Sequence, residues 1–278
     1  MKQWFWMWCV LLVCPMTTIA QEVNLTPWYE TGQRFAFHHT DTVEINQMGF
    51  QGFQAPTQGF ETIELRGEIR VLDAADGKLN RVETFYELAE TRSQIVGAHR
   101  PQTTRNPLQG KTITISRLPG AEHDPTRWSV DVAGITLTPV QMASIRDRFA
   151  RTLFPNQAIQ PGQRIEIRNV DLLLNTDWKG QTNLQYIRGE RGADGRPVAI
   201  VDVRVTAESN KPAAGQTPDI LTTNSLGGTM LVDFETRQIV GLDLQGQFVM
   251  ETGGAQGQPL FYYGRRTITS RQVVMQKM

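Results

Sequence analysis

Two short polar patterns are the parts of this sequence that could do chemistry. His39 and Asp41 interrupt the apolar face of one expected strand, and Asn169 and Asp171 interrupt the matching face of another. A carboxylate on a buried face needs hydrogen-bond donors or water, because an unpaired buried charge is costly. The functional interpretation is a paired polar binding site on a pseudo-twofold axis, lining a cavity. The alternative is a β-bulge or a strand end at which the buried face swaps.

Other chemistry finds little support in the residue types and spacings. His38 and His39 are adjacent and therefore point to opposite faces of a regular strand. The sequence has no His-Glu-x-x-His motif, no aspartate-rich calcium loop and no Gly-x-Ser-x-Gly turn. We therefore expect no metal and no cofactor. Carboxylates such as Asp41 and Asp171, with His39 as a base, leave a hydrolase of envelope polymers or glycans as an alternative.

Aromatic residues spaced by glycine form a second candidate surface. Phe50, Phe53 and Phe60 lie in a stretch, 49–60, that we expect to be a loop. Such a loop could enter a lipid surface, grip a partner or flank the mouth of a cavity. The alternative is a long loop that packs its phenylalanines onto the edge of a sheet.

One segment has helical rather than strand periodicity. Thr138 can cap a helix that has Pro139 at its first position. Met142, Ile145 and Phe149 then recur at helical spacing. We predict a helix over 138–154 that connects two halves of the chain and packs its apolar side over one open end of a sheet. A lid over a ligand cavity is the other interpretation.

The elements that must position these residues are mainly strands. Apolar and polar residues alternate over 62–71, 201–208 and 242–251, which is typical of antiparallel sheet with one dry face. Asp76-Gly77 and Asp194-Gly195 indicate hairpin turns. Long loops are expected at 97–107 and 211–224. The predicted strands are 33–46, 60–73, 79–95, 110–118, 126–134, 163–175, 180–190, 196–209, 226–234, 238–251 and 260–275.

An internal repeat predicts how the strands are grouped. Four short motifs recur in the same order, among them Gly32-Gln33-Arg34 as Gly162-Gln163-Arg164. We predict a mainly β protein with two similar antiparallel sheets, half-barrel or sandwich-like, that arose by internal duplication. The first repeat is expected over 21–137 and the second over 155–278, with the connecting helix between them.

The start of the chain predicts export. Residues 1–20 resemble a secretory signal peptide, with an apolar core too short to span a membrane and small residues before Gln21. Both cysteines, Cys9 and Cys14, lie inside this segment, so the mature chain has no thiol. Lipidation at Cys14 is an open alternative. With 28 Lys and Arg against 28 Asp and Glu, the chain lacks the positive charge that nucleic-acid binding needs.

Two turn regions resemble a known group of proteins. The stretch from Leu153 to Gln163, and the later Gly227-Gly228 with Asp233 to Ile239, are similar to motifs of exported bacterial two-repeat antiparallel β proteins of unknown function. Arg237 or Gln238 stands where that pattern has glycine. The resemblance implies a bacterial envelope and an antiparallel β fold, and it transfers no catalytic residue. A remoter similarity of architecture is to periplasmic lipoprotein carriers, which are incomplete barrels with a helical lid.

These observations predict a non-enzymatic exported protein of the periplasm or the extracellular space. It would bind a lipid-like ligand or an envelope protein partner on a concave β surface, and nucleic acid is not expected as a partner. A carboxylate-dependent hydrolase and a structural assembly subunit with open sheet edges remain as alternatives. No later apolar stretch reaches membrane-spanning length. The candidate binding residues are His39, Asp41, Asn169, Asp171, Phe50, Phe53, Phe60, Met142, Ile145 and Phe149.

Overall fold

The computed structural model describes most of the chain, and strands dominate the part that it describes. The described residues are 21–50, 53–120, 127–139, 142, 145, 146, 149, 158–167, 179–192, 194–213, 216–253 and 259–275. The predicted signal peptide therefore lies outside them. No helix among these residues is long and apolar enough to cross a membrane.

Eight of the described strands, β2–β4 and β10–β14, are longer than the average strand of globular proteins. The described strands run as follows: β1 Val23–Asn24, β2 Arg34–Phe50, β3 Phe53–Ala75, β4 Lys78–Gln94, β5 Gln102–Arg105, β6 Thr112–Arg117, β7 Trp128–Val132, β8 Ala158–Ile159, β9 Arg164–Ile167, β10 Lys179–Arg191, β11 Pro197–Ala213, β12 Gln216–Asp233, β13 Ile239–Gly253 and β14 Pro259–Met275.

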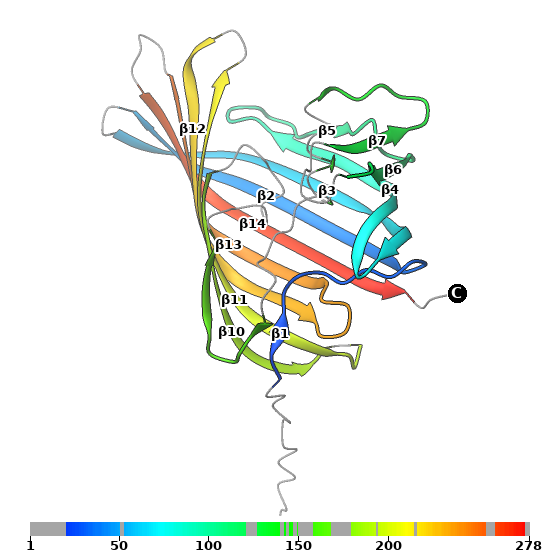
Figure 1. Cartoon of the computed structure of the whole chain (residues 1–278). Coiled ribbons are helices and arrows are strands. Elements are labelled where there is room, and N and C mark those ends of the chain that lie inside the picture. Colours follow the sequence, from blue (N-terminus) through cyan, green and yellow to red (C-terminus); the bar gives the residue numbers. More distant parts are fainter. Residues whose placement is uncertain are drawn as a thin grey trace, which may run out of the picture.

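One large antiparallel sheet replaces the two sheets that the repeat predicts. Within the described residues it has 12 strands in the order β7-β6-β4-β3-β2-β14-β13-β12-β11-β10-β9, with β5 paired to β4. β1 and β8 form a separate two-stranded sheet. The last strand, β14, pairs with β2 from Leu260↔Phe50 to Met275↔Arg34. The two halves are therefore fused into one curved layer, because the ends of the meander hydrogen-bond to each other (Figure 1).

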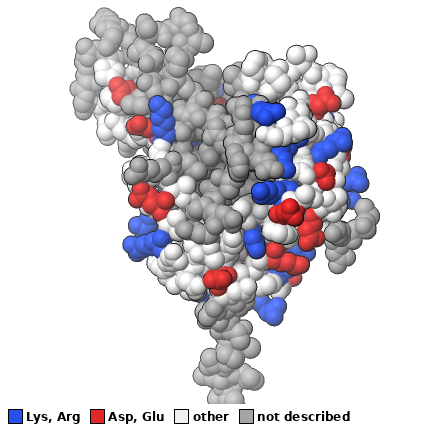
Figure 2. All heavy atoms as spheres, in the orientation of Figure 1, with Lys and Arg blue, Asp and Glu red and all other residues white. Residues whose placement is uncertain are grey.

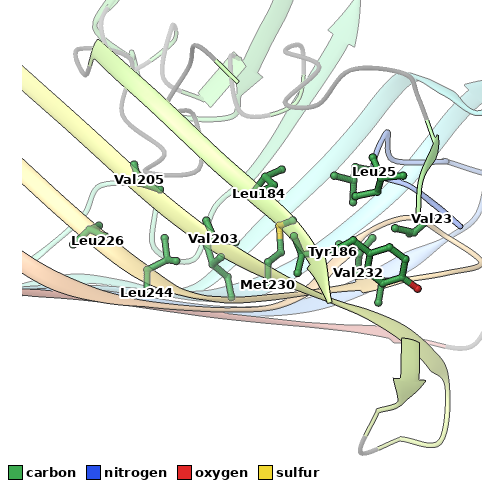
Figure 3. Packing of buried hydrophobic residues seen from close by; sticks show 14 of the residues in the cluster. Val23, Leu25, Leu184, Tyr186, Val203, Val205, Leu226, Met230, Val232 and Leu244 are labelled. Carbon is green, nitrogen blue, oxygen red and sulfur yellow. The ribbon is translucent and has the colours of Figure 1, made fainter. Parts of the chain in front are cut away.

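Alternation along each strand gives the sheet one dry face, which we call the inner face. Two hydrophobic clusters lie on it among the described residues. The first gathers side chains of β10–β14 with Val23, Leu25 and Ile159 of the small sheet. The second gathers side chains of β2–β7 with Ile145. Figure 3 shows the first cluster on the side toward which the strands curve.

The two turns that share the Gly-Gln-Arg motif have the same local structure. The amide of Gly32 donates to the carbonyl of Val71, and that of Gly162 donates to the carbonyl of Tyr186. Both glycines have positive φ, at 87° and 85°. In each turn the glutamine side chain accepts from the amide three residues earlier, at 2.9 and 3.0 Å. Equal turns explain the repeated motif locally, while the duplication of the whole chain stays a prediction.

Two of the three expected loops are largely strand, and the third is mostly loop with one short strand. The aromatic stretch 49–60 forms the adjoining ends of β2 and β3, and 211–224 lies mainly in β11 and β12. The third, 97–107, contains β5. The loops were predicted from their proline and glycine content. Both residues are also tolerated within strands at bulges and hairpin ends, so this content does not exclude a strand. Asp76-Gly77 is confirmed as a tight turn: Ala75 pairs with Lys78, and the two turn residues have φ of 52° and 74°.

A diagonal line of glycines crosses three neighbouring strands of the sheet. Gly228 lies in β12, Gly246 in β13 and Gly264 in β14. A Cβ at any of them would overlap a backbone carbonyl oxygen of an adjacent strand. We call this line the glycine crease, since glycine permits sharp bending and close backbone approach in a sheet. Beyond it the ends of the β2–β3, β11–β12 and β13–β14 hairpins fan outward (Figure 1).

Candidate functional site

An ion pair stands at the centre of the inner face. Asp41 of β2 and Arg266 of β14 are diagonal neighbours, since Asp41 pairs with Ile268 and Arg266 pairs with Val43. Arg266 donates from Nε to Oδ1 at 2.9 Å and from Nη2 to Oδ2 at 2.6 Å. The side chains are only 6% and 13% exposed. This two-pronged geometry is the strongest form of a carboxylate–guanidinium contact.

Asn224 of β12 extends this polar group across β13. Its Oδ1 lies 3.5 Å from Nη1 of Arg266. The β13 residue that pairs with Arg266 is Gly246, which has no side chain. Asn224 is 2% exposed, and its buried Nδ2 has no hydrogen-bond partner among the described residues. We call Asp41, Arg266 and Asn224 the polar triad.

His39 lies on the same face as Asp41, two residues earlier in β2, and is 6% exposed. His38 points the other way, where its Nε2 lies 2.9 Å from Oε1 of Glu64 in a half-exposed pair. The prediction that the two histidines occupy opposite faces is confirmed. Sequence reasoning therefore placed His39 and Asp41 correctly on one face, but it missed Arg266 and Asn224.

The signal that could have found Arg266 is weak. Arg266 shares a face of β14 with Ile268 and Val274, so an arginine there interrupts a partly apolar face as Asp41 does in β2. Ser270 and Gln272 are polar at the same alternate positions, which weakens the pattern. Opposite charges that break two apolar faces are candidates for a pair. The neighbouring Arg265 hides this signal, because an adjacent arginine makes either residue a candidate for the wet face.

Apolar side chains that solvent still reaches surround the triad. Val43 and Ile45 of β2 and Ile63 of β3 are half-buried and belong to neither hydrophobic cluster. Val43 pairs with Arg266, and Ile63 pairs with Asp41. We call these three residues the central strip. It lies between the first cluster, which includes Ile268, and the second, which Leu65 contacts.

The small sheet of β1 and β8, and the region between β7 and β9, cover the flanks of the strip. Val23 and Leu25 pack on the first cluster, and the hydroxyl of Tyr186 donates to the carbonyl oxygen of Gln21 at 2.8 Å. Burial raises the pKa of Tyr186 above its ordinary value. Ile145 and Phe149 pack on the second cluster. The covers therefore come from the N-terminal segment and from the region between β7 and β9.

The predicted helix is described only at separate positions. Pro139, Met142, Ile145 and Phe149 have helical backbone, and the amide of Met142 donates to the carbonyl of Thr138 at 3.0 Å. Ile145 is 8% exposed and Met142 is 36% exposed. The other predicted residues of 138–154 lie outside the described set, apart from Arg146.

The remaining candidate residues whose side chains the structure describes do not gather at the triad. Asn169 and Asp171 lie outside the described residues, as does the side chain of Phe50. Phe53 is 70% exposed at the start of β3. Phe60 is half-buried and pairs with Glu44, away from Asp41. The structure therefore separates the aromatic residues from the polar ones.

The described residues offer little for catalysis. No group of three or more His, Cys, Asp and Glu side chains among them could hold a metal ion. Among the described residues the ion-pair partner of Asp41 is the guanidinium of Arg266, whereas glycoside hydrolysis needs a second carboxylate at a defined separation. A groove of about 290 Å³ reaches Asn224 of the triad, and Thr223, Ser225 and Gln247 are among the other residues that line it.

Comparisons with known proteins give no family. No family model matches the chain, and no curated protein matches it. A solved structure of lipid–protein interactions in lipovitellin is similar over 89% of this chain and 25% of its own, with 10% identity and a TM-score of 0.41. An outer membrane channel from Pseudomonas putida F1 is similar over 89% of this chain and 98% of its own, with 8% identity and a TM-score of 0.24. The chain thus spans about a quarter of the lipovitellin chain.

Proposed function

We propose that this protein is a non-enzymatic, exported envelope protein that binds a lipid-like ligand on its inner face. The polar end of the ligand contacts Asn224 beside the Asp41–Arg266 pair, and its apolar chain lies on the central strip. The observation that carries the proposal is the buried amide donor of Asn224, which has no partner among the described residues. It belongs to a polar group whose other members, Arg266 and Asp41, neighbour the half-exposed central strip.

The chemistry of the triad selects the kind of head group. Nδ2 of Asn224 offers N–H donors, so the ligand must present an oxygen acceptor. Asp41 neutralises Arg266, and the site therefore has no excess positive charge with which to attract an anion. An ester or hydroxyl oxygen fits this environment better than a phosphate does. We infer an uncharged, oxygen-bearing head group such as that of an acylglycerol.

The central strip supplies the apolar contact. A sheet of this size must cover its dry face, and the described covers lie over the two flanking clusters. An acyl chain along Val43, Ile45 and Ile63 would remove apolar surface from water at about 25 cal/mol per Å². This gain, together with one satisfied amide donor, gives the ligand both an orientation and a driving force.

Export and duplication belong to the same proposal. The apolar segment 1–20 directs the chain out of the cytoplasm, and the mature chain begins at Gln21. The matching turns at Gly32 and Gly162 support an ancestral repeat whose two copies now share one sheet. An envelope location supplies membrane lipids as ligands.

A titration with a fluorescent monoacylglycerol analogue tests the proposal. We expect saturable binding to residues 21–278, and we expect Asn224→Leu to weaken it about tenfold, the effect of losing one good hydrogen bond at a buried site. Asn183→Leu is the matched control, because Asn183 lies in β10 with its side chain away from the first cluster. Equal affinity of both variants and wild type would remove Asn224 from the site, and absence of binding to wild type would reject the proposed function.

A further inference from the structure

Two hairpin ends beyond the glycine crease form one continuous blade. β14 pairs with β2 as far as Leu260↔Phe50, β2 pairs with β3 as far as Phe50↔Phe53, and β13 pairs with β14 as far as Gly253↔Pro259. The ends of β13, β14, β2 and β3 therefore lie side by side, and in Figure 1 they project away from the body of the molecule. We call this region, 45–50, 53–60, 247–253 and 259–264, the blade.

The blade is nearly free of charge. The chain has no Lys, Arg, Asp or Glu from Ile45 to Phe60 or from Thr252 to Gly264. Glu251 is the one charged residue of the blade. By contrast, Figure 2 shows Lys and Arg interspersed with Asp and Glu over the body of the molecule. The third hairpin end differs, since β11 and β12 carry Glu208, Lys211 and Asp219.

Apolar and aromatic side chains lie on both faces of the blade. Phe261 and Tyr263 stack on one face with ring centroids 6.3 Å apart, opposite Gly49, whose missing side chain leaves them space. Met48 and Tyr262 pair across the two strands and share the other face. All four side chains are half-buried or partly exposed, and Phe53 at the end is 70% exposed.

A charged boundary marks where the blade meets the body. Arg265 pairs with Glu44, and Glu61 pairs with Val43 on the next strand. Arg265, Glu44 and Glu61 are all exposed. From this boundary the run from Ile45 to Phe50 extends roughly 17 Å at about 3.3 Å per residue. That length is comparable to the interfacial region of one leaflet plus the start of its hydrocarbon core.

We propose that the blade inserts into the surface of a lipid bilayer, from which the protein takes or to which it delivers the ligand of its inner face. This inference rests on the proposed function. Tyrosine and other aromatic residues favour the membrane interface, because one part of the side chain is apolar and another is polar. A bilayer surface contacts a thin blade on both faces at once, whereas a protein groove that covers one face leaves the other wet. Apolar and aromatic side chains lie on both faces of the blade, among uncharged polar ones such as Gln54 and Gln58.

The blade also points to the kind of membrane contact. Its lack of charge means that insertion draws on apolar burial rather than on attraction to anionic lipid. Binding to uncharged phosphatidylcholine vesicles should therefore persist when the salt concentration is raised about tenfold, which screens exposed charges. A basic surface would behave in the opposite way.

Co-sedimentation of residues 21–278 with phosphatidylcholine vesicles tests the inference. We expect wild type to partition onto the vesicles and Phe53→Asp to lose at least tenfold in partitioning, because a charge at the exposed end opposes insertion. Val273→Asp is the matched control: Val273 is 57% exposed near the opposite end of β14, so the same charge there should leave partitioning unchanged. Phe261→Asp, on the other strand pair, gives an independent second variant, and circular dichroism checks that each variant is folded.

The outcomes separate this inference from the proposed function. Binding of the soluble monoacylglycerol analogue by wild type, without partitioning onto vesicles, would overturn the blade and leave the ligand site standing. Vesicle binding that Phe53→Asp and Phe261→Asp retain would also overturn it, as would binding only to vesicles with anionic lipid. Loss in the two blade variants alone would support it, and a folded Phe53→Asp that instead fails to bind a protein partner would reassign the blade to protein recognition.

Discussion

The Asp41–Arg266 pair carries a cost that its surroundings must offset. Two charges leave water, and their attraction compensates only if the geometry is good and the remaining donors are satisfied. The two short hydrogen bonds meet the first condition. The condition that all donors be satisfied is met only in part, because Nδ2 of Asn224 has no hydrogen-bond partner among the described residues. A polar group of this kind costs stability in the empty protein, which is expected of a residue kept for binding.

A substitution series in β14 tests how much the buried pair matters. Arg266→Met leaves the carboxylate of Asp41 buried without its cation, and we expect a loss of about 3–5 kcal/mol in the free energy of unfolding. Asp41→Leu combined with Arg266→Met should recover most of this loss. Urea denaturation followed by circular dichroism measures both. Arg271→Met is the control, because Arg271 and Asp243 form a pair that is 50% and 55% exposed and should contribute less than about 1 kcal/mol. Equal losses at Arg266 and Arg271 would contradict the account.

The same triad predicts an unusual separation of stability from binding. Asn224→Leu removes a buried amide that lacks a partner, so the free energy of unfolding should stay within about 1 kcal/mol of wild type or rise. Ligand affinity should fall in the same variant. Thermal unfolding in the absence of ligand gives the first quantity. A loss of several kcal/mol would instead identify Asn224 as a structural residue.

Only Asp41 of the triad was predictable, because its partners are far away along the chain. Alternation along β2 is local, so the sequence indicates that His39 and Asp41 share an apolar face. Arg266 is 225 residues away, and its pairing with Asp41 depends on the β14–β2 ladder. Alternation within one strand carries no information about which strand lies next to it. Asn224 is a further two strands away and was inaccessible for the same reason.

At the scale of elements, the short N-terminal strand acts as a cover for the long ones. Val23 and Leu25 are 2% and 1% exposed, so they contribute to the first cluster as fully as residues of the large sheet do. The hydroxyl of Tyr186 fixes this cover to β10 through the carbonyl of Gln21. Burial raises the pKa of this phenol above its ordinary value.

This raised pKa predicts a pH dependence with a definite sign. An acid whose pKa is higher in the folded than in the unfolded state contributes stability below its unfolded pKa and loses it as pH rises through the folded pKa. Wild type should therefore lose stability above about pH 10. Tyr186→Phe should be about 1 kcal/mol less stable at neutral pH and show a smaller decline at high pH. Denaturant titrations from about pH 8 upward provide the comparison, and parallel pH profiles would refute the role of Tyr186.

Two adjacent glycines, Gly228 in the glycine crease and Gly227 outside it, test whether the crease requires glycine. Gly228→Ala places a methyl group against the carbonyl oxygen of Asp243, so the backbone must move and stability should fall by about 2 kcal/mol or more. In Gly227→Ala the new Cβ meets nothing nearer than the carbonyl oxygen of Val203 at 3.9 Å. That variant should be close to neutral. Thermal unfolding of both measures the difference, and similar melting temperatures would show that the crease does not require glycine.

Element identity was more predictable than element length. The alternation over 62–71 and 242–251 located β3 and β13, but both strands run on past the point where glycine and proline enter the sequence. A strand that crosses a crease needs glycine inside it, and a sequence pattern cannot distinguish that glycine from one in a loop. β1 and β8, at two residues each, are too short to show any periodicity.

At the scale of the whole molecule, one curved sheet combines three surfaces. The inner face holds the polar triad and the central strip, chain segments cover the flanks, and the blade projects beyond the crease. Two-sheet architecture was expected because a duplication usually yields two copies of a unit. The pairing of β14 with β2 fuses them instead, so the polar triad draws on strands from both halves of the chain.

Native mass spectrometry of the protein purified from its own envelope tests the central claim most directly. The account predicts a species heavier than the bare chain from Gln21 to Met278 by a mass in the lipid range, released by mild denaturation. The bound fraction should fall in Asn224→Leu and persist in Asn183→Leu. The contradicting result is a wild-type protein that carries no such bound mass after purification and that also fails to bind the acylglycerol analogue. Those two findings together would reject the proposal that the inner face binds a lipid-like ligand.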